Sequence, residues 1–206
     1  MNKLLSLIAV LALGLSQSVF ADSLVGGDAD AGKGKAAACT ACHGPGGNST
    51  NPEWPRLAGQ SEAYTVGQLQ AFKSGARANP LMAGQVAGLS EQDMKDIAAY
   101  FYAQTPLTGA ASPDLAEAGQ TLYRAGNTEN AVPACMGCHG PKGEGNAAAA
   151  FPRIAGQHAD YSAAQLRIYR DGKRKGTDKA KMMSDVAAKL TDEEIAAVAS
   201  YLSGLH

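Results

Sequence analysis

The chain has 206 residues, with 18 Lys or Arg against 19 Asp or Glu, and a formal net charge of -1. This near-neutral balance argues against nucleic acid as a partner, because nucleic-acid binding requires concentrated positive charge. No second long apolar run follows the N-terminal stretch, which argues against an integral membrane protein.

The N-terminus has the pattern of a secretory signal peptide, residues 1–21. Met1–Lys3 supplies a positive charge, Leu4–Leu15 forms an apolar run, and Val19–Ala21 is a small-residue cleavage site. An uncleaved membrane anchor is disfavoured because the apolar run is short and polar residues follow it. We therefore expect export to the periplasm and a mature chain that begins near Asp22.

Two copies of the pentapeptide Cys-x-x-Cys-His use all four cysteines of the chain. Two thiols one helical turn apart can add across the two vinyl groups of one haem, and the adjacent imidazole then lies beneath the same porphyrin to ligate the iron. The pattern predicts two covalently bound haem c groups. The predicted attachment residues are Cys39, Cys42, Cys135 and Cys138, and the predicted iron ligands are His43 and His139.

Other uses of the cysteines explain the pattern less well. A structural zinc site gives no reason for a His after each second Cys, and Cys42 and Cys135 are most of a domain apart. A thioredoxin-like redox motif expects a preceding strand, whereas residues 31–38 are expected to be helical. Disulfides within each pair leave the two histidines unexplained.

An internal repeat divides the mature chain into two halves. Pro55–Gln60 reads Pro-Arg-Leu-Ala-Gly-Gln and recurs as Pro152–Gln157, with Ile in place of Leu. The order of features is the same in both halves, and the uncharged, turn-forming segment Thr105–Pro113 lies between them. The repeat predicts one domain at residues 22–104, a linker at 105–113 and a second domain at 114–206.

Both halves are predicted to be helical, so the fold class is all-α. Ser90 and Thr191 each precede acidic residues, which is typical of a helix start. Met94, Ile97 and Phe101 then recur at helical spacing, and no segment alternates as a strand would. The expected helices are 30–42, 64–74 and 90–103 in the first half, and 116–124, 161–171 and 191–203 in the second.

The haem motifs, the repeated Pro-Arg segments, the linker and the Gly-Leu-His ending together resemble the cytochrome c4 family over essentially the whole mature chain. The resemblance implies two tandem class I cytochrome c domains whose His/Met-ligated haems face each other across the domain interface. It further implies an electron carrier, not an enzyme, that works between a membrane quinol-oxidising complex and a terminal oxidase. Peripheral association with the membrane is compatible with this role. The alternative is a dihaem redox enzyme such as a peroxidase, which needs one accessible iron.

The second axial ligands are expected to be methionines. A haem that only transfers electrons needs both axial positions filled, because an open position binds oxygen, peroxide or carbon monoxide. Met82 and Met183 occupy equivalent loop positions, each seven residues before a leucine, and are the predicted ligands. Met182 is the main competitor at the second haem. Met94 is expected in the core, and Met136 lies beside its own histidine, where it cannot reach the opposite face of the haem.

Further residues have expected supporting roles. The family resemblance implies that the carbonyl groups of Pro55 and Pro152 accept the proton of each ligating imidazole's other nitrogen. Arg56 and Arg153 are candidates to neutralise haem propionates. His158 has Ser61 as its counterpart, so a surface or hydrogen-bonding role is expected for it.

Two glycines stand inside the opening helices, where glycine lowers helix stability. The resemblance implies that Gly32 and Gly119 allow close packing against Tyr100 and Tyr201.

Positive charge is concentrated in the second half. Residues 22–111 carry six Lys or Arg and eight acidic residues, whereas residues 112–206 carry eleven of each. A basic run in the second half is expected to be exposed, either as an ordinary solvated surface or as a docking patch for an acidic redox partner. It contains Arg167, Arg170, Lys173, Arg174, Lys175, Lys179 and Lys181.

Overall fold

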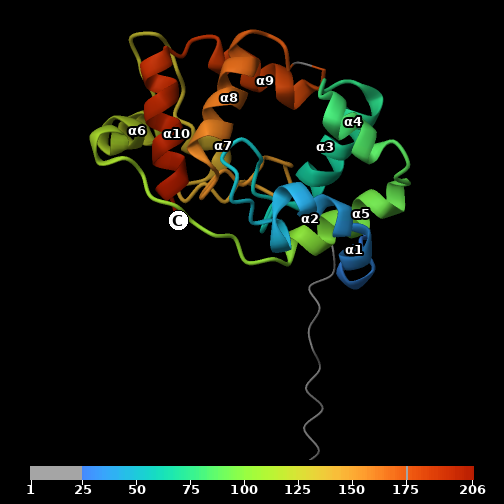
Figure 1. Ribbon diagram of the computed structural model, residues 1–206. Coiled ribbons are helices and arrows are strands. Elements are labelled where there is room, and N and C mark those ends of the chain that lie inside the picture. Colours follow the sequence, from blue (N-terminus) through green and yellow to red (C-terminus); the bar gives the residue numbers. More distant parts are fainter. Residues whose placement is uncertain (1–24, 175) are drawn as a thin grey trace, which may run out of the picture.

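The computed structural model describes residues 25–174 and 176–206 (Figure 1). The predicted signal peptide and Lys175 lie outside these residues. Within the described ranges there is no strand, only isolated bridges between Asn127 and Val132 and between Asn146 and Phe151. The all-α prediction is confirmed. No helix in this part of the chain is long and apolar enough to cross a membrane.

Each half contributes its own set of helices. The first half contains α1 (Ala29–Lys35), α2 (Ala37–His43), a short 3-10 turn η1 (Pro45–Gly47), α3 (Glu62–Ser74), α4 (Pro80–Val86) and α5 (Glu91–Tyr102). The second half contains α6 (Pro113–Ala125), α7 (Met136–His139), α8 (Ala159–Arg170), α9 (Asp178–Ala187) and α10 (Asp192–Gly204). Figure 1 shows the two sets side by side, joined by a segment that runs along one edge of the molecule.

The closing helices begin where their capping residues predict. The Ser90 hydroxyl accepts from the Asp93 backbone N–H, and the Asp93 carboxylate accepts in return from Ser90. Thr191 and Glu194 form the same reciprocal pair at the start of α10. These capping boxes satisfy backbone donors that have no partner within the helix.

Two local predictions are wrong. The expected helix 30–42 is divided at Ala36, which ends α1 and immediately precedes α2. The segments around Met82 and Met183 are helices α4 and α9, not loops. The Asn79 side chain accepts from the Met82 backbone N–H to start α4, and Thr177 accepts from Ala180 to start α9. These caps, which the sequence analysis did not use, explain the difference.

In both halves the first helix crosses the last helix at a glycine. A Cβ atom on Gly32 would lie 1.9 Å from the Asp96 carbonyl oxygen and 2.9 Å from the Tyr100 Cβ. On Gly119 it would lie 2.2 Å from the Ala197 carbonyl oxygen and 2.6 Å from the Tyr201 Cβ. Only glycine permits this backbone approach, so the expected close packing is confirmed.

The buried apolar side chains form two separate clusters, one in each half. The first contains Ala36, Leu69, Phe72, Val86, Met94, Ile97 and Phe101. The second contains Leu122, Tyr123, Val132, Ala155, Ala187, Leu190, Ile195, Val198, Leu202 and Leu205. Met94 is 2% exposed, which confirms its expected place in the core. Separate cores are the property expected of two domains.

The connecting segment is fixed by hydrogen bonds to both halves. The Leu107 N–H donates to the Asn48 side chain in the first half, at 3.0 Å. The Gly109 N–H donates to the Ser203 carbonyl at the end of α10, at 2.9 Å. The segment therefore holds the halves in a defined relation, and Pro113 at its end is already the first residue of α6.

Candidate functional site

The two motif histidines have matching surroundings. His43 is 8% exposed, and its Nδ1 lies 2.9 Å from the Pro55 carbonyl oxygen. His139 is 7% exposed, and its Nδ1 lies 3.0 Å from the Pro152 carbonyl oxygen. Because a carbonyl oxygen only accepts, Nδ1 must carry the proton, and the lone pair of Nε2 is left for a metal. The expected role of both proline carbonyls is confirmed.

Burial also keeps these imidazoles in their ligating form. Burial lowers the pKa of His43 and of His139 by more than the bond to the proline carbonyl raises it. A neutral imidazole with a protonated Nδ1 is the form that binds iron through Nε2. Each histidine is therefore ready for ligation, with its orientation fixed by the protein.

A glycine turns the chain after each histidine so that the proline carbonyl can return to it. Gly44 has a backbone φ angle of 76° and Gly140 one of 77°, values that residues other than glycine rarely adopt. Beyond these turns, the Gly47 carbonyl accepts the N–H groups of both residues 57 and 58, and the Gly143 carbonyl accepts those of 154 and 155. These bonds position the two Pro-Arg segments.

Cys39 and Cys42 lie in helix α2, Cys135 directly precedes α7, and Cys138 lies within α7. Burial raises the pKa of Cys39, and raises that of Cys135 to about 11, so both remain protonated near neutral pH. This environment differs from that of a reactive redox thiolate. In the structure no disulfide joins the cysteines of either pair. The zinc alternative also lacks support, because the described residues contain no group of three or more His, Cys, Asp or Glu that could hold a metal ion.

The candidate methionines differ in burial. Met82 is half-buried and packs against the first core, as Cys39 does. Met183 is half-buried on α9, whereas its neighbour Met182 is 50% exposed. A buried thioether suits ligation better than one in solvent. In the second core, the partly buried side chains include Cys135 and Met136, but Met183 is not among them.

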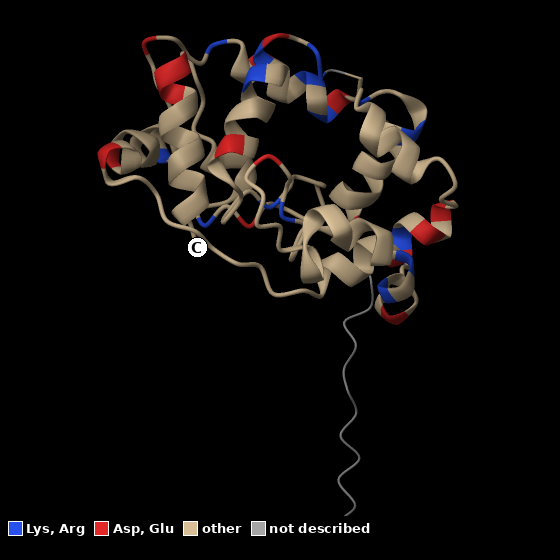
Figure 2. Ribbon diagram, viewed as in Figure 1, with Lys and Arg blue, Asp and Glu red and all other residues tan. Residues whose placement is uncertain are grey.

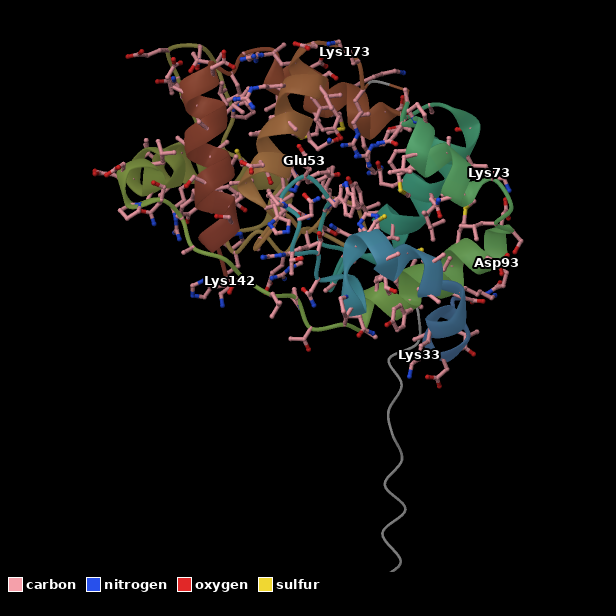
Figure 3. The ribbon with its side chains drawn as sticks, viewed as in Figure 1. Lys33, Glu53, Lys73, Asp93, Lys142 and Lys173 are labelled. Carbon is pink, nitrogen blue, oxygen red and sulfur yellow. The ribbon has the colours of Figure 1, made fainter. Side chains whose placement is uncertain are left out.

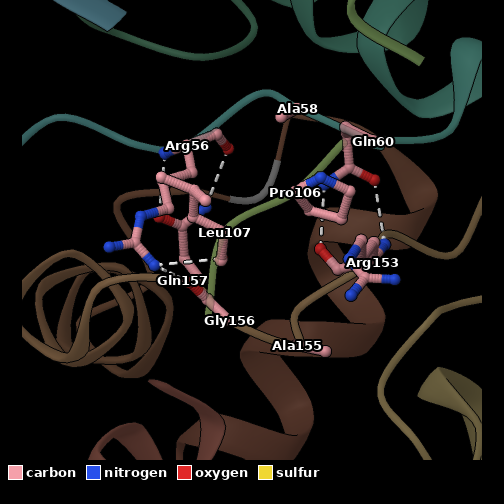
Figure 4. Close-up of a pocket in the computed structure, with 9 residues that line it drawn as sticks. All are labelled: Arg56, Ala58, Gln60, Pro106, Leu107, Arg153, Ala155, Gly156 and Gln157. Atoms are coloured by element: carbon pink, nitrogen blue, oxygen red, sulfur yellow. Dashed lines mark hydrogen bonds between the residues drawn. The ribbon is translucent and has the colours of Figure 1, made fainter. Parts of the chain in front are cut away.

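The Pro-Arg segments meet each other between the halves, around a small pocket (Figure 4). The Gln157 side chain bonds both the N–H and the carbonyl of Arg56, at 2.9 and 3.0 Å. The Gln60 side chain bonds the same two groups of Arg153, at 2.9 and 2.8 Å. The repeated hexapeptide therefore builds a pseudo-symmetric interface.

The hydrogen bonds of Arg56 and Arg153 indicate whether an anionic group of a cofactor could bind beside them. The Arg56 Nη1 donates to the carbonyl groups of Leu107 and Gly156, at 3.1 and 2.6 Å. The Nε atoms of both arginines are buried and have no hydrogen-bond partner in the described parts of the chain. A buried donor without a partner is costly, and a haem propionate would satisfy it. The residues present therefore fit haem.

His158 makes a contact between the halves, as expected for a hydrogen-bonding residue. Its Nε2 lies 2.8 Å from the Ser49 carbonyl oxygen and donates to it. Its first-half counterpart Ser61 instead caps α3, accepting from the Tyr64 N–H.

The basic run is not uniformly exposed, which corrects its expected position. Arg174 is only 4% exposed, and its guanidinium donates to Gln165, Tyr64 and Gln68. Lys173 lies at the outer edge of the molecule, paired with Asp171 (Figure 3). In Figure 2 the ribbon is coloured for Lys or Arg at several positions near the connection between α8 and α9. Arg174 therefore belongs to the interior of the interface, whereas Lys173 belongs to the surface.

Arg77 is a functional candidate that sequence reasoning missed, and Arg174 was expected only as one member of the basic run. The two positions do not align, because the second half has additional residues between Gly172 and Met183. The sequence does contain a signal for this contact: Tyr64 and Gln68 of α3 recur as Tyr161 and Gln165 of α8. These side chains accept hydrogen bonds from the two arginines.

The fold and the paired sites define a two-domain c-type cytochrome. The family model for cytochrome c matches residues 29–102 and 116–206. A cytochrome c4 of Azotobacter vinelandii is 47% identical, with all of both chains covered. A crystal structure of cytochrome c4 from Pseudomonas stutzeri, also 47% identical, has a TM-score of 0.84 and covers 87% of this chain and 100% of its own.

A more distant relative is named for its redox partner. A thiosulfate dehydrogenase electron acceptor of Thiomonas intermedia is 39% identical, over 82% of this chain and 79% of its own. The chain belongs to the cytochrome c4 family, and it carries two covalently bound haem c groups.

Proposed function

We propose that this protein is a periplasmic electron carrier that turns over no substrate of its own. Cys39 and Cys42 attach the first haem, and Cys135 and Cys138 attach the second. His43 and Met82 ligate the first iron, and His139 and Met183 ligate the second. Residues 22–104 and 114–206 are the two haem domains, with 105–113 as the linker.

The observation that carries this proposal is the paired arrangement of buried imidazole and proline carbonyl. A ligand held in one orientation, in its neutral form, reorganises little when the iron changes oxidation state. Bound haem supplies reversible one-electron chemistry. The surrounding chain excludes water from the histidines and holds the proton on each Nδ1. A site built this way suits electron transfer better than a peroxidase reaction, which needs an open iron.

The partners are proposed as a membrane quinol-oxidising complex and a terminal oxidase. The relative that accepts electrons from thiosulfate dehydrogenase favours a second donor class, a periplasmic oxidising enzyme. Either partner would dock near the exposed lysines of the second half, which include Lys173 and Lys181. Their positive charge steers an acidic surface during encounter.

Replacing the proposed methionine ligands tests the axial ligation. Met82→Ala and Met183→Ala should each keep both haems attached, open one iron to carbon monoxide and lower that haem's potential, because only the thioether is lost. Met182→Ala is the matched control and should change neither property. If Met183→Ala kept the low-spin spectrum and its potential, the assignment of that ligand would be wrong.

Charge reversal tests the docking surface. Because Arg174 is buried, the informative substitutions are Lys173→Glu, Lys179→Glu and Lys181→Glu together. This variant should slow bimolecular electron transfer to an acidic partner and reverse or flatten the dependence of the rate on ionic strength. Stopped-flow rates across a salt series measure both effects. Unchanged rates and slopes would show that this surface is merely solvated.

A further inference from the structure

The two haem motifs are joined to the fold in different ways, although the residues around them repeat. In the first half, α2 follows α1 directly after Ala36, so the chain itself places the motif on the opening helix. In the second half, α7 is only 4 residues long, and residues 126–135 separate it from α6. A helix of one turn is not stable by itself, so the second motif requires a support other than continuity of the chain.

Tyr123 supplies such a support. It lies on α6, one helical turn after the crossing glycine Gly119, and is 0% exposed. Its hydroxyl donates to the Gly140 carbonyl oxygen at 2.5 Å, and that oxygen also accepts the Gly143 N–H at 3.1 Å. Burial raises the pKa of Tyr123, so the hydroxyl keeps its proton and remains a donor. A buried side chain of α6 is thereby bound to the residue that directly follows His139.

The corresponding place in the first half has no hydroxyl. One helical turn after Gly32 stands Ala36, which is also 0% exposed. The aromatic ring behind the first motif comes instead from Phe101 of α5, because a Cβ atom on Gly47 would lie 2.7 Å from its Cδ1 atom. The residue of α10 equivalent to Phe101 is Leu202. The halves have exchanged a large and a small side chain, and only the second arrangement adds a hydrogen-bond donor.

The Tyr123 hydroxyl fixes a flexible point beside the proposed ligand. Gly140 has a backbone φ angle of 77°, and glycine restricts the backbone less than any other residue. The Gly145 N–H donates to the His139 carbonyl at 2.9 Å, and the His139 Nδ1 donates to the Pro152 carbonyl at 3.0 Å. The bond from Tyr123 adds a constraint on the next peptide, so its loss would loosen the segment that orients the imidazole.

We propose that Tyr123 is a positioning residue for the second haem alone, whose hydroxyl holds the peptide after His139 and thereby the orientation of the imidazole on the iron. This inference rests on the proposed function, because it requires His139 to ligate the second iron. The hydroxyl also pairs the Gly140 carbonyl oxygen, and an unpaired carbonyl dipole would favour the more positive ferric iron. Two sites built from a repeated sequence thus become unequal through one hydroxyl.

The test is Tyr123→Phe in the intact dihaem protein, which removes the hydroxyl and keeps the ring. NMR of protein with labelled histidine follows exchange of the Nδ1 protons of His43 and His139, and a spectroelectrochemical titration gives the potential of each haem. We expect the His139 proton to exchange about tenfold faster, which corresponds to about 1.4 kcal/mol, the upper range for one hydrogen bond. The potential of the second haem should fall, because the Gly140 carbonyl loses a donor. The His43 proton and the potential of the first haem should stay unchanged.

Tyr201→Phe is the matched control. The ring centroids of Tyr201 and Tyr123 lie 5.5 Å apart, but the Tyr201 hydroxyl lies 3.5 Å from the Arg124 Nε instead of at the haem motif. This variant should leave both Nδ1 protons and both potentials unchanged. Exchange of the α10 amides measures the overall opening of the second half, and so separates global destabilisation from the local effect at His139.

Three results would overturn the inference. In the first, the His139 proton gains no exchange beyond that of the α10 amides, or the potential of the second haem does not fall, so that Tyr123 serves stability only. In the second, both haems shift alike, so that the effect is not specific to the second site. In the third, Tyr201→Phe has the same effects as Tyr123→Phe, which assigns them to the packing of the two rings.

Failure of the proposed function gives a different result, which is visible before any substitution. In that case the unmodified protein itself lacks two haems with low-spin, six-coordinate spectra. If those spectra are intact and only the predicted changes in Tyr123→Phe are absent, the proposed function stands and the role of Tyr123 is wrong.

Discussion

The crossing of the first and last helices is the same in both halves, but different side chains stabilise it. In the first half, Lys35 on α1 pairs with Asp93 and Asp96 on α5, at 2.7 and 2.5 Å. In the second half, α6 presents Leu122 and Tyr123 to an apolar cluster against α10, and both side chains are almost fully buried. One crossing is held by charge at its edge, the other by apolar packing.

This difference shows which part of the crossing the fold requires. The glycine that allows backbone contact is present in both halves. The side chains beside it differ: they form ion pairs in the first half and apolar contacts in the second. The backbone approach sets the geometry, and either kind of side chain can then stabilise it. We expect substitution of either glycine to destabilise its own half to a similar extent, whereas the ionic and the apolar side chains each matter in one half only.

Substituting the crossing glycines should have the largest effect. Gly32→Ala and Gly119→Ala each place a Cβ atom within 2.2 Å of a backbone carbonyl oxygen, so the helices must separate. We expect a loss of about 3 kcal/mol, the upper range for overpacking, in the half that carries the change. Native-state hydrogen exchange of α5 and α10 amides measures each half separately.

Gly34→Ala is the matched control on the same helix as Gly32. Nothing lies within 4 Å of the Cβ atom that it adds, and alanine favours the helix by about 0.5–1 kcal/mol. It should therefore stabilise the first half slightly. Equal tolerance of Gly32→Ala and Gly34→Ala would show that backbone contact is not what fixes the crossing.

Removing the buried carboxylate should affect the first half alone. Asp96 accepts from Lys35, from the Asp28 N–H and from Gln92, and only 4% of its side chain is exposed. Asp96→Ala should cost about 2 kcal/mol, less than breaking a fully buried pair, because the Lys35 side chain is 34% exposed. α5 should lose hydrogen-exchange protection while α10 keeps it. Asp114→Ala, an exposed control on α6, should change stability by less than about 0.5 kcal/mol.

Acid should weaken the same contact without any substitution. Burial raises the pKa of Asp96, but its bonds to Lys35, Asp28 and Gln92 outweigh burial and lower this pKa overall. The pair is therefore fully stabilising above the unfolded pKa of about 4, and this contribution is lost as the pH falls through the folded pKa. We expect part of the first-half stability to be lost on acidification, less than in Asp96→Ala. In Asp96→Ala the stability of the first half should depend less on pH. An unchanged dependence would contradict the assignment of this acid sensitivity to Asp96.

The repeat explains how much of the structure the sequence could predict. Features present in both halves at matching positions were predicted correctly, including the capped helices that start after Ser90 and Thr191 and the glycine crossings. The helices around Met82 and Met183 were missed because their caps, Asn79 and Thr177, are different residues. The haem ligands themselves stay predictions, since the motif fixes chemistry and spacing but not the path of the methionine segment.

The burial of Arg174 could not be predicted for a related reason. A basic run that spans two helices and the loop between them normally indicates a solvated surface. Here the second half packs on the first, so that Tyr64 and Gln68 reach Arg174 from more than a hundred positions away in the sequence. Such a contact depends on how two domains meet, which no local pattern encodes.

The smallest predicted effect concerns the point where the pseudo-symmetry fails, His158 opposite Ser61. Burial lowers the pKa of His158, and Arg56 lowers it further, while the bond to Ser49 and the charge of Asp160 raise it. Because the folded state holds the imidazole neutral, stability falls as the pH drops from about 6.5 through the lower folded pKa. The effect should stay below about 1 kcal/mol, because the residue is partly exposed.

Hydrogen exchange in residues 48–51, compared at pH 7 and pH 5, measures this effect at the contact itself, after correction for the intrinsic pH dependence of exchange. His158→Gln supplies a matched control, because its side-chain N–H can still donate to the Ser49 carbonyl but does not titrate. The unmodified protein should lose protection at pH 5 and the variant should not. Equal losses in both proteins would assign the pH dependence to another group, and the interface would then depend on the Pro-Arg segments, Arg77 and Arg174 alone.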